Sequence, residues 1–182
     1  MILSNLGVLL AERKQKMTKV SSNTGISRTT LTALTSNRCR GIQFDTLNTL
    51  CNYLDITPSD LLYFYPIDIQ QINIDVSEIN LNNHVYSKEL EGTIDITVKA
   101  KNKEKVYTFD IYIGVITCAE ISENSGADVT VSTTDPENKA FIKKMPPIVL
   151  SKFKSDIEDF IDSNYETDYN ITSSCVIFDT ND

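Results

Sequence analysis

The hydrophobic pattern of this chain changes its period at Pro66, and that change divides the sequence into two parts. Before Pro66, apolar residues recur at the three- and four-residue spacing of amphipathic helices. After it, apolar and polar residues alternate, as they do in strands that bury one face. Separate blocks of the two periods predict an α+β chain with two domains, at residues 1–66 and 67–182.

Residues 1–66 predict five short helices that pack as a compact bundle. Ser27 is a good N-cap for the third helix, residues 37–41 form a polar loop, and Thr57, Pro58 and Asp60 begin the fifth helix. Apolar residues at helical spacing mark the buried faces, and the leucines of the third and fourth helices are expected in the core. The apolar positions are Leu3, Leu6, Leu9, Leu10, Val20, Leu31, Leu34, Phe44, Leu47, Leu50, Cys51 and Leu54.

Residues 67–182 predict a mostly antiparallel β-sheet with one helix packed on it. The helix is expected at residues 146–165, after a double proline, because Ile157, Phe160 and Ile161 fall at helical spacing. A turn is expected at residues 102–105 and a loop at residues 122–128. The expected strands are residues 67–81, 92–101, 106–121, 128–134 and 170–180.

The charges are distributed unevenly, although the net charge is −8. Residues 1–44 hold seven basic side chains and one acidic one, a net charge of +6. Residues 67–182 hold ten lysines and 21 acidic side chains, a net charge of −11. This asymmetry indicates a small part that faces nucleic acid, joined to an acidic part with a different task.

Several functional classes lack the residues they need. No apolar run approaches the ~20 residues that cross a bilayer, and the first residues do not form a secretory signal, so a cytoplasmic protein is expected. The four cysteines are widely spaced and are expected to be reduced. With His84 as the single histidine and no Gly-rich phosphate loop, we expect no metal site, no cofactor, no catalytic residues and no enzymatic activity.

Residues 17–36, "MTKVSSNTGISRTTLTALTS", form the unit that carries chemistry. Gly25 is its ninth residue, where a tight turn between two helices needs a left-handed backbone, and Ser21 is small at the point where the helices cross. The apolar positions face the core. The outward positions of the second helix are short or hydrogen-bonding: Arg28, Thr29, Thr32 and Ala33.

With these features, residues 3–65 resemble the Cro/cI-type (lambda-repressor-like, XRE family) helix-turn-helix DNA-binding domains. The resemblance rests on "TGISRTTLTAL", "NRCRGI", "FDTLNTLCNYL" and "ITPSDLL". It implies a five-helix lambda-repressor-like bundle that binds double-stranded DNA. One departure is Met17, where many members have a glutamine that braces the first base contact and reaches a phosphate.

The resemblance also implies DNA-contacting residues. The recognition helix would run from Arg28 to Thr35 in the major groove, where arginine donates two parallel bonds to guanine and threonine or alanine methyls touch thymine. The implied base contacts are Arg28, Thr29, Thr32 and Ala33. The implied phosphate contacts are Thr18, Lys19, Asn37, Arg38 and Arg40. For each polar residue, a solvated surface side chain is the alternative.

Two interpretations of the whole chain remain. In the first, the chain is a transcriptional regulator, expected to be a repressor, which binds a palindromic operator as a homodimer. Its second domain then dimerises or senses a small-molecule or protein signal. In the alternative, the second domain is an acidic effector that inhibits a protein partner such as a nuclease, as anti-CRISPR or antitoxin proteins do.

Overall fold

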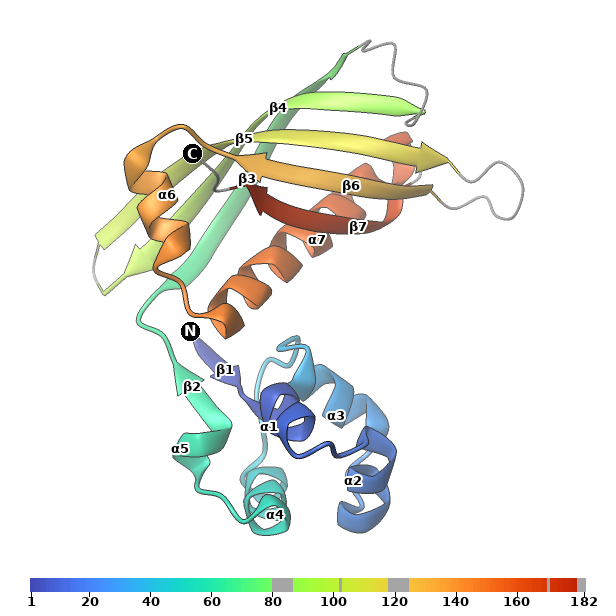
Figure 1. The fold of residues 1–182 in the computed structure, drawn as a ribbon, viewed down its shortest axis with the longest axis vertical. Coiled ribbons are helices and arrows are strands. Elements are labelled where there is room, and N and C mark those ends of the chain that lie inside the picture. The colour runs from blue at the N-terminus through green and yellow to red at the C-terminus, as the bar shows by residue number, and fades with distance from the viewer. Residues whose placement is uncertain (80–86, 102, 118–124, 170, 180–182) are drawn as a thin grey trace. The chain divides into compact units, whose positions relative to one another are not determined.

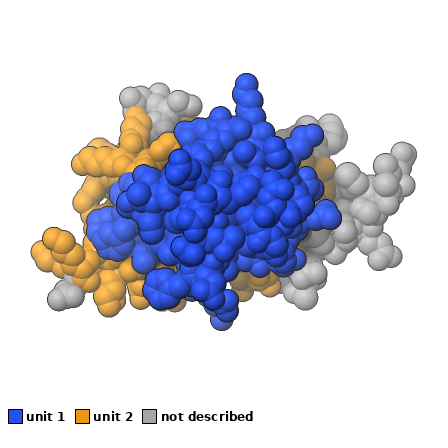
Figure 2. Space-filling model, turned by 90° about the horizontal axis from the view of Figure 1, so that it is seen from below, with its two compact units in different colours: residues 1–66 blue, residues 67–182 orange. Residues whose placement is uncertain are grey.

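The computed structural model describes residues 1–79, 87–101, 103–117, 125–169 and 171–179, and His84 lies outside them. The chain divides into two compact units, Met1–Pro66 and Ile67–Asp182. Figure 1 shows the elements of each unit, and Figure 2 distinguishes the two units by colour. No helix among the described residues is long and apolar enough to span a bilayer.

The first unit is mainly helical. Its helices are α1 (Leu6–Glu12), α2 (Met17–Thr24), α3 (Arg28–Thr35), α4 (Phe44–Leu54) and α5 (Pro58–Leu61). It also contains two short antiparallel strands, β1 (Ile2–Ser4) and β2 (Leu62–Phe64), in which Leu3 lies opposite Tyr63.

The spacing from Leu3 to Leu6 predicts that Leu3 lies on the first helix, and this prediction is wrong. Leu3 is buried in β1 because its strand pairs with a segment about sixty residues later in the chain. The backbone N–H of Asn5 then donates to the carbonyl of Leu61 at 2.8 Å, and the helix begins only after this contact.

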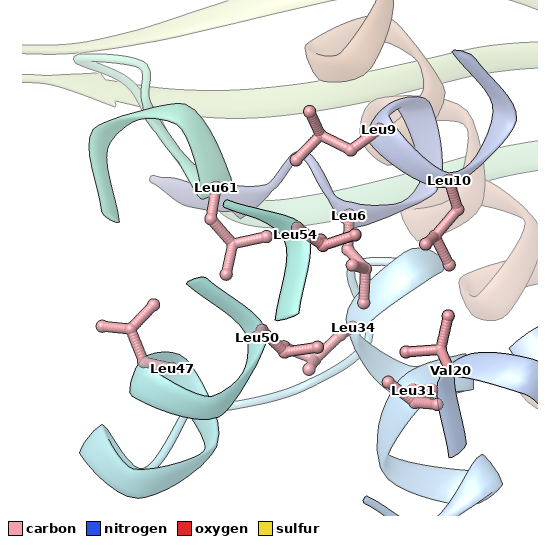
Figure 3. Close-up of a cluster of buried hydrophobic side chains, with 10 residues drawn as sticks. All are labelled: Leu6, Leu9, Leu10, Val20, Leu31, Leu34, Leu47, Leu50, Leu54 and Leu61. Carbon is pink, nitrogen blue, oxygen red and sulfur yellow. The ribbon is translucent and has the colours of Figure 1, made fainter. Parts of the chain in front are cut away.

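Leucines from α1, α3, α4 and α5, together with Val20 from α2, share one core, shown in Figure 3. Phe44, by contrast, is 86% exposed, because it is the first residue of α4 and precedes the turn that packs. The carbonyl of Leu54 at the other end of α4 accepts a hydrogen bond from the Arg13 guanidinium. The core cluster consists of Leu6, Leu9, Leu10, Val20, Leu31, Leu34, Leu47, Leu50, Leu54 and Leu61.

The described residues of the second unit form a five-stranded sheet with two helices (Figure 1). The strand order follows the chain, and every neighbouring pair is antiparallel except the parallel pair β6–β7. The chain between these two strands forms the helices. The elements are β3 (Asp68–Ile79), β4 (Lys88–Ala100), β5 (Lys103–Thr117), β6 (Ser125–Ser132), α6 (Pro136–Lys143), α7 (Pro147–Tyr169) and β7 (Ile171–Asp179).

The second unit differs from the sequence expectation in several places, among them β4, which begins at Lys88 rather than at residue 92. The unit has two helices rather than one: α6 begins where the Asp135 carboxylate accepts from the N–H groups of Glu137 and Asn138 at 2.7 and 3.0 Å. Eight residues give too little periodicity to reveal this helix. Strand β5 begins within the expected turn at 102–105, and β6 begins at Ser125 within the expected loop at 122–128, because both extend pairing with a neighbouring strand.

The two faces of the sheet have opposite character. Side chains alternate along each strand, and one set, which includes Ile94, Phe109 and Val129, is buried against α7. The buried side chains of α7 are Val149, Phe153, Ile157 and Ile161. On α6, the ring of Phe141 stacks on the ring of Tyr107, with 3.8 Å between the ring centroids. The other set of side chains faces away from the helices. It includes the exposed acidic residues Asp75, Glu91, Asp110, Asp128 and Asp179.

Gly92 marks a close approach between β3 and β4. It lies opposite Val76, and a Cβ atom at this position would stand 1.9 Å from the carbonyl oxygen of Asp75. No real Cβ tolerates this distance, so any side chain would force the two backbones apart. A Cβ at Gly126 on β6, in contrast, would have its nearest neighbours at 3.9 Å.

We expect Gly92→Ala to destabilise the protein by about 1–3 kcal/mol, because β3 must shift to admit the methyl group. Gly126→Ala is the matched control and should cause no loss, since an ordinary contact distance is available there. Urea unfolding followed by circular dichroism measures both. Equal stability of the two variants would contradict the close approach.

Candidate nucleic-acid interface

The angle between α2 and α3 is fixed at Gly25. Its φ of 73° is left-handed, and its N–H donates to the carbonyl of Ser21 at 3.0 Å, which closes α2. The hydroxyl of Ser21 donates to the carbonyl of Ile26 at 2.7 Å, across the turn. The small residue expected at the helix crossing therefore also forms a hydrogen bond that holds the two helices together.

Helix α3 has a buried side and an exposed side. Ser27 caps it, accepting from the N–H of Thr30 at 3.1 Å, as its sequence predicts. Leu31 and Leu34 are 0% and 2% exposed and anchor the helix in the leucine core. Among the predicted base contacts, Arg28, Thr29 and Thr32 are exposed and Ala33 is half-buried. The fold thus presents these residues on the accessible side of α3.

Met17 contacts α3 directly. The hydroxyl of Thr32 lies 3.3 Å from the Met17 sulfur, so the first residue of α2 supports a side chain predicted to read DNA. A thioether accepts only weakly and carries no amide donor. Met17 therefore steadies Thr32. Unlike a glutamine at this position, it has no amide group with which to reach a phosphate.

Most residues predicted to contact phosphate lie on the surface around α3. Thr18 and Lys19 are exposed on the first turn of α2, and Arg38 and Arg40 are exposed in the loop after α3. Asn37 is different. Its amide oxygen accepts from the N–H of Ser4 at 2.5 Å, and its amide nitrogen donates to the carbonyl of Ser4 at 3.2 Å.

Both ends of the Asn37 side chain are thus used within the first unit, and Asn37 has a left-handed φ of 55°. A phosphate near this residue would have to compete with the pairing to Ser4. The sequence offered no sign of this role, because Ser4 lies 33 residues away. The phosphate contact at Asn37 stays a prediction.

Arg13 is also committed to the fold. Its guanidinium donates to the carbonyl of Leu54 at the end of α4 and lies near Asp60. The hydroxyl and the backbone N–H of Thr57 bind the Asp60 carboxylate at 2.6 and 2.8 Å. These hydrogen bonds, together with the charge of Arg13, lower the pKa of Asp60. Arg13 therefore stabilises helix ends rather than extending the exposed basic surface around α3.

A hollow of about 410 Å³ lies beside α3, and the sequence did not single out all of its residues. Thr29, Thr30 and Ala33 form one side of it, and the loop before α4 forms the other. Gln43 is the N-cap residue of α4, and its side chain does not accept a hydrogen bond from the first N–H groups of that helix. The helix start was visible in the sequence, but its position opposite α3 required the fold.

A glycine turn, a capped second helix and an exposed polar face on that helix together define a helix-turn-helix. Residues 5–66 match the sequence model of the Cro/C1-type HTH DNA-binding domain. Over 63 residues the chain is 33% identical to the "Uncharacterized HTH-type transcriptional regulator YozG" of Bacillus subtilis (strain 168), an alignment that covers 35% of this chain and 75% of the relative.

A crystal structure of a protein from Bacteroides fragilis, provisionally described as DNA-binding, is also similar. It is 25% identical, with 35% of this chain and all of that chain covered and a TM-score of 0.32. Given the match to the Bacillus protein and to the family model, the chain belongs to the Cro/C1-type helix-turn-helix family, through its first unit.

Replacing Gly25 should separate backbone strain from simple loss of a glycine. Gly25→Ala is expected to destabilise the first unit by about 1–2 kcal/mol, because alanine resists the left-handed conformation that φ of 73° requires. Gly41→Ala is the matched control, since Gly41 has open space around its Cβ position and no such φ. Thermal unfolding compares the two. A Gly25→Ala protein as stable as Gly41→Ala would show that the turn carries no strain.

Proposed function

We propose that this protein is a transcriptional repressor that binds a palindromic DNA operator as a homodimer. The carrying observation is the exposed side of α3, where Arg28, Thr29 and Thr32 stand outward while Leu31 and Leu34 hold the helix in the core. The name of the Bacillus relative, an HTH-type transcriptional regulator, supports the regulatory role. A protein that occupies a promoter blocks transcription by its presence, so repression requires no further activity.

In this proposal α3 enters the major groove. Arg28, at the first position of the helix, donates two bonds to the O6 and N7 atoms of a guanine, and the methyl groups of Thr29, Thr32 and Ala33 face thymine. Thr18, Lys19, Arg38 and Arg40 contact phosphates and set the register. The net charge of +6 on residues 1–44 provides long-range attraction to DNA.

The proposed dimer follows from the size of the unit. One recognition helix contacts only a few base pairs, so specificity in a genome requires two half-sites, about 34–36 Å apart along the DNA. The second unit would then hold the two copies together, and a small-molecule or protein signal could act by changing this association. Selection of bound sites from random DNA by the full-length protein tests the proposal. Failure to enrich a palindrome would refute the dimeric operator.

The open face of the sheet favours one second candidate. Its exposed acids, among them Asp75, Glu91 and Asp110, carry the opposite charge to the basic surface of a nucleic-acid-binding enzyme. In this candidate the second unit binds and blocks a basic protein such as a nuclease, and the first unit serves as an accessory DNA-binding module. A monomeric chain that binds such an enzyme tightly at low salt would favour it over the dimeric repressor.

Arg28→Ala should weaken binding to the selected site by about 1–3 kcal/mol and relax the preference at one base position. The reason is the loss of a bidentate contact that only guanine satisfies. Fluorescence anisotropy with the selected site and its single-base variants measures both effects. Lys103→Ala, which removes a positive charge from the exposed surface of the second unit, is the control. An equal loss on every sequence would reduce Arg28 to a phosphate contact.

Arg38→Ala should weaken binding to all sequences alike and lower the slope of log affinity against log salt by about one. A phosphate contact releases about one counterion and carries no sequence information, which accounts for both effects. Titrations at several salt concentrations give the slope. An unchanged slope would remove Arg38 from the set of phosphate contacts.

A further inference from the structure

Strand β3 is an edge strand with an unpaired outer side. The sheet order β3-β4-β5-β6-β7 places it at one end, and within the described residues its other side has no strand partner. It is twelve residues long and contains no lysine, arginine, proline or glycine. Proline and charged residues, lysine above all, are the residues with which natural proteins block edge pairing, and of these β3 has only the acids Asp68, Asp75 and Glu78. Such an edge is a template for another strand.

The apolar side of β3 is also incompletely covered. Ile72, Ile74 and Val76 point to the helix-covered face but stay half-buried, whereas their neighbours on β4, such as Ile94 and Ile96, are fully buried. A hollow of about 580 Å³ separates the start of β3 from α7. The apolar row of the sheet therefore continues to the edge and is left open there.

The sequence of β3 is close to a palindrome in side-chain type. When the strand is laid antiparallel on a copy of itself about Ile74, Ile72 faces Val76 and Ile74 faces itself. Asn73 then faces Asp75 of the copy, and Gln71 faces Ser77, so each acid meets an amide and no like charges meet. The regular pairing of β3 with β4 over these residues begins after the irregularity between Ile69 and Gln71.

The two central polar side chains are available for such pairing. Asn73 and Asp75 are exposed on the face away from the helices. Asn73 uses its oxygen to accept from Gln71 at 2.9 Å, and its amide N–H groups have no acceptor among the residues that the structure describes. Among the described residues, the Asp75 carboxylate takes part in no hydrogen bond or ion pair. An amide that donates to a carboxylate across a strand pair is a favourable cross-strand contact.

We propose that the edges of β3 from two copies of this chain pair antiparallel about Ile74 and join the two sheets into one. The pairing is two-fold symmetric, so each contact away from Ile74 on the axis occurs twice. This inference deepens the dimer of the proposed function and rests on it. The first residues of the two β3 strands, each six residues from the centre, would lie about 40 Å apart along the strands.

The test uses the full-length chain and charge exchange at two exposed positions. Asn73→Asp places two carboxylates opposite each other at both symmetric contacts, and it should weaken the dimer about tenfold. The double variant Asn73→Asp with Asp75→Asn restores an acid opposite an amide and should return the dimer to the affinity of the unaltered protein. Ser173→Asp adds the same charge to the other edge strand, β7, and should change nothing. Sedimentation equilibrium measures the dimer dissociation constants.

The double variant also tests the register. If the strands paired about Asn73 instead, the carboxylate introduced by Asn73→Asp would face its own copy, and the second substitution would not rescue the dimer. A monomeric unaltered chain at micromolar concentration, an unaffected Asn73→Asp dimer, an equal effect of Ser173→Asp or a failed rescue would each overturn the proposal. DNA binding is measured separately: a dimer insensitive to Asn73→Asp that binds a palindrome refutes this interface alone, whereas a chain that binds no DNA refutes the proposed function.

Discussion

The left-handed turn at Gly25 is the constraint on which the candidate interface depends. It sets the direction in which α3 leaves α2, and the hydrogen bond from Ser21 to Ile26 keeps the two helices close. With that direction fixed, Leu31 and Leu34 can enter only the leucine core. The outward position of Arg28, Thr29 and Thr32 is then a consequence of burial on the opposite side, and the Met17 sulfur further steadies the Thr32 hydroxyl.

The second unit is organised by its helices in a comparable way. Because α7 covers one face of the sheet, that face is apolar and the other can carry many acids. The helix also returns the chain so that β7 joins β6 in parallel. Helix α7 covers β3 less completely than the other strands, so Ile72 and Ile74 are only half-buried. An incompletely covered edge is a common starting point for association between sheets.

Local signals allowed much of the first unit to be predicted. Ser27, Gly25, Thr57 and the leucine spacing each act within a few residues, and the structure confirms the helix ends that they predict. Contacts between distant residues were not visible. The pairing of β1 with β2, the bonds from Asn37 to Ser4 and the cap of Arg13 on Leu54 all join residues more than thirty positions apart. Helix α6 was not predicted because its eight residues show little periodicity. Its first turn is fixed by the Asp135 cap.

The parallel pair β6–β7 has a consequence for the order in which the protein forms during synthesis. The fully buried core of the helix-turn-helix is complete at Leu61, whereas β7 begins at Ile171, on the order of 100 residues later. At about 5–20 residues per second, a ribosome takes several seconds to make that segment. During this interval the basic unit can fold while the sheet still lacks its last strand. Residues 1–66 carry a net charge of +3, so a nascent chain that has just completed the first unit is positively charged, and it becomes negative as the acidic second unit is added.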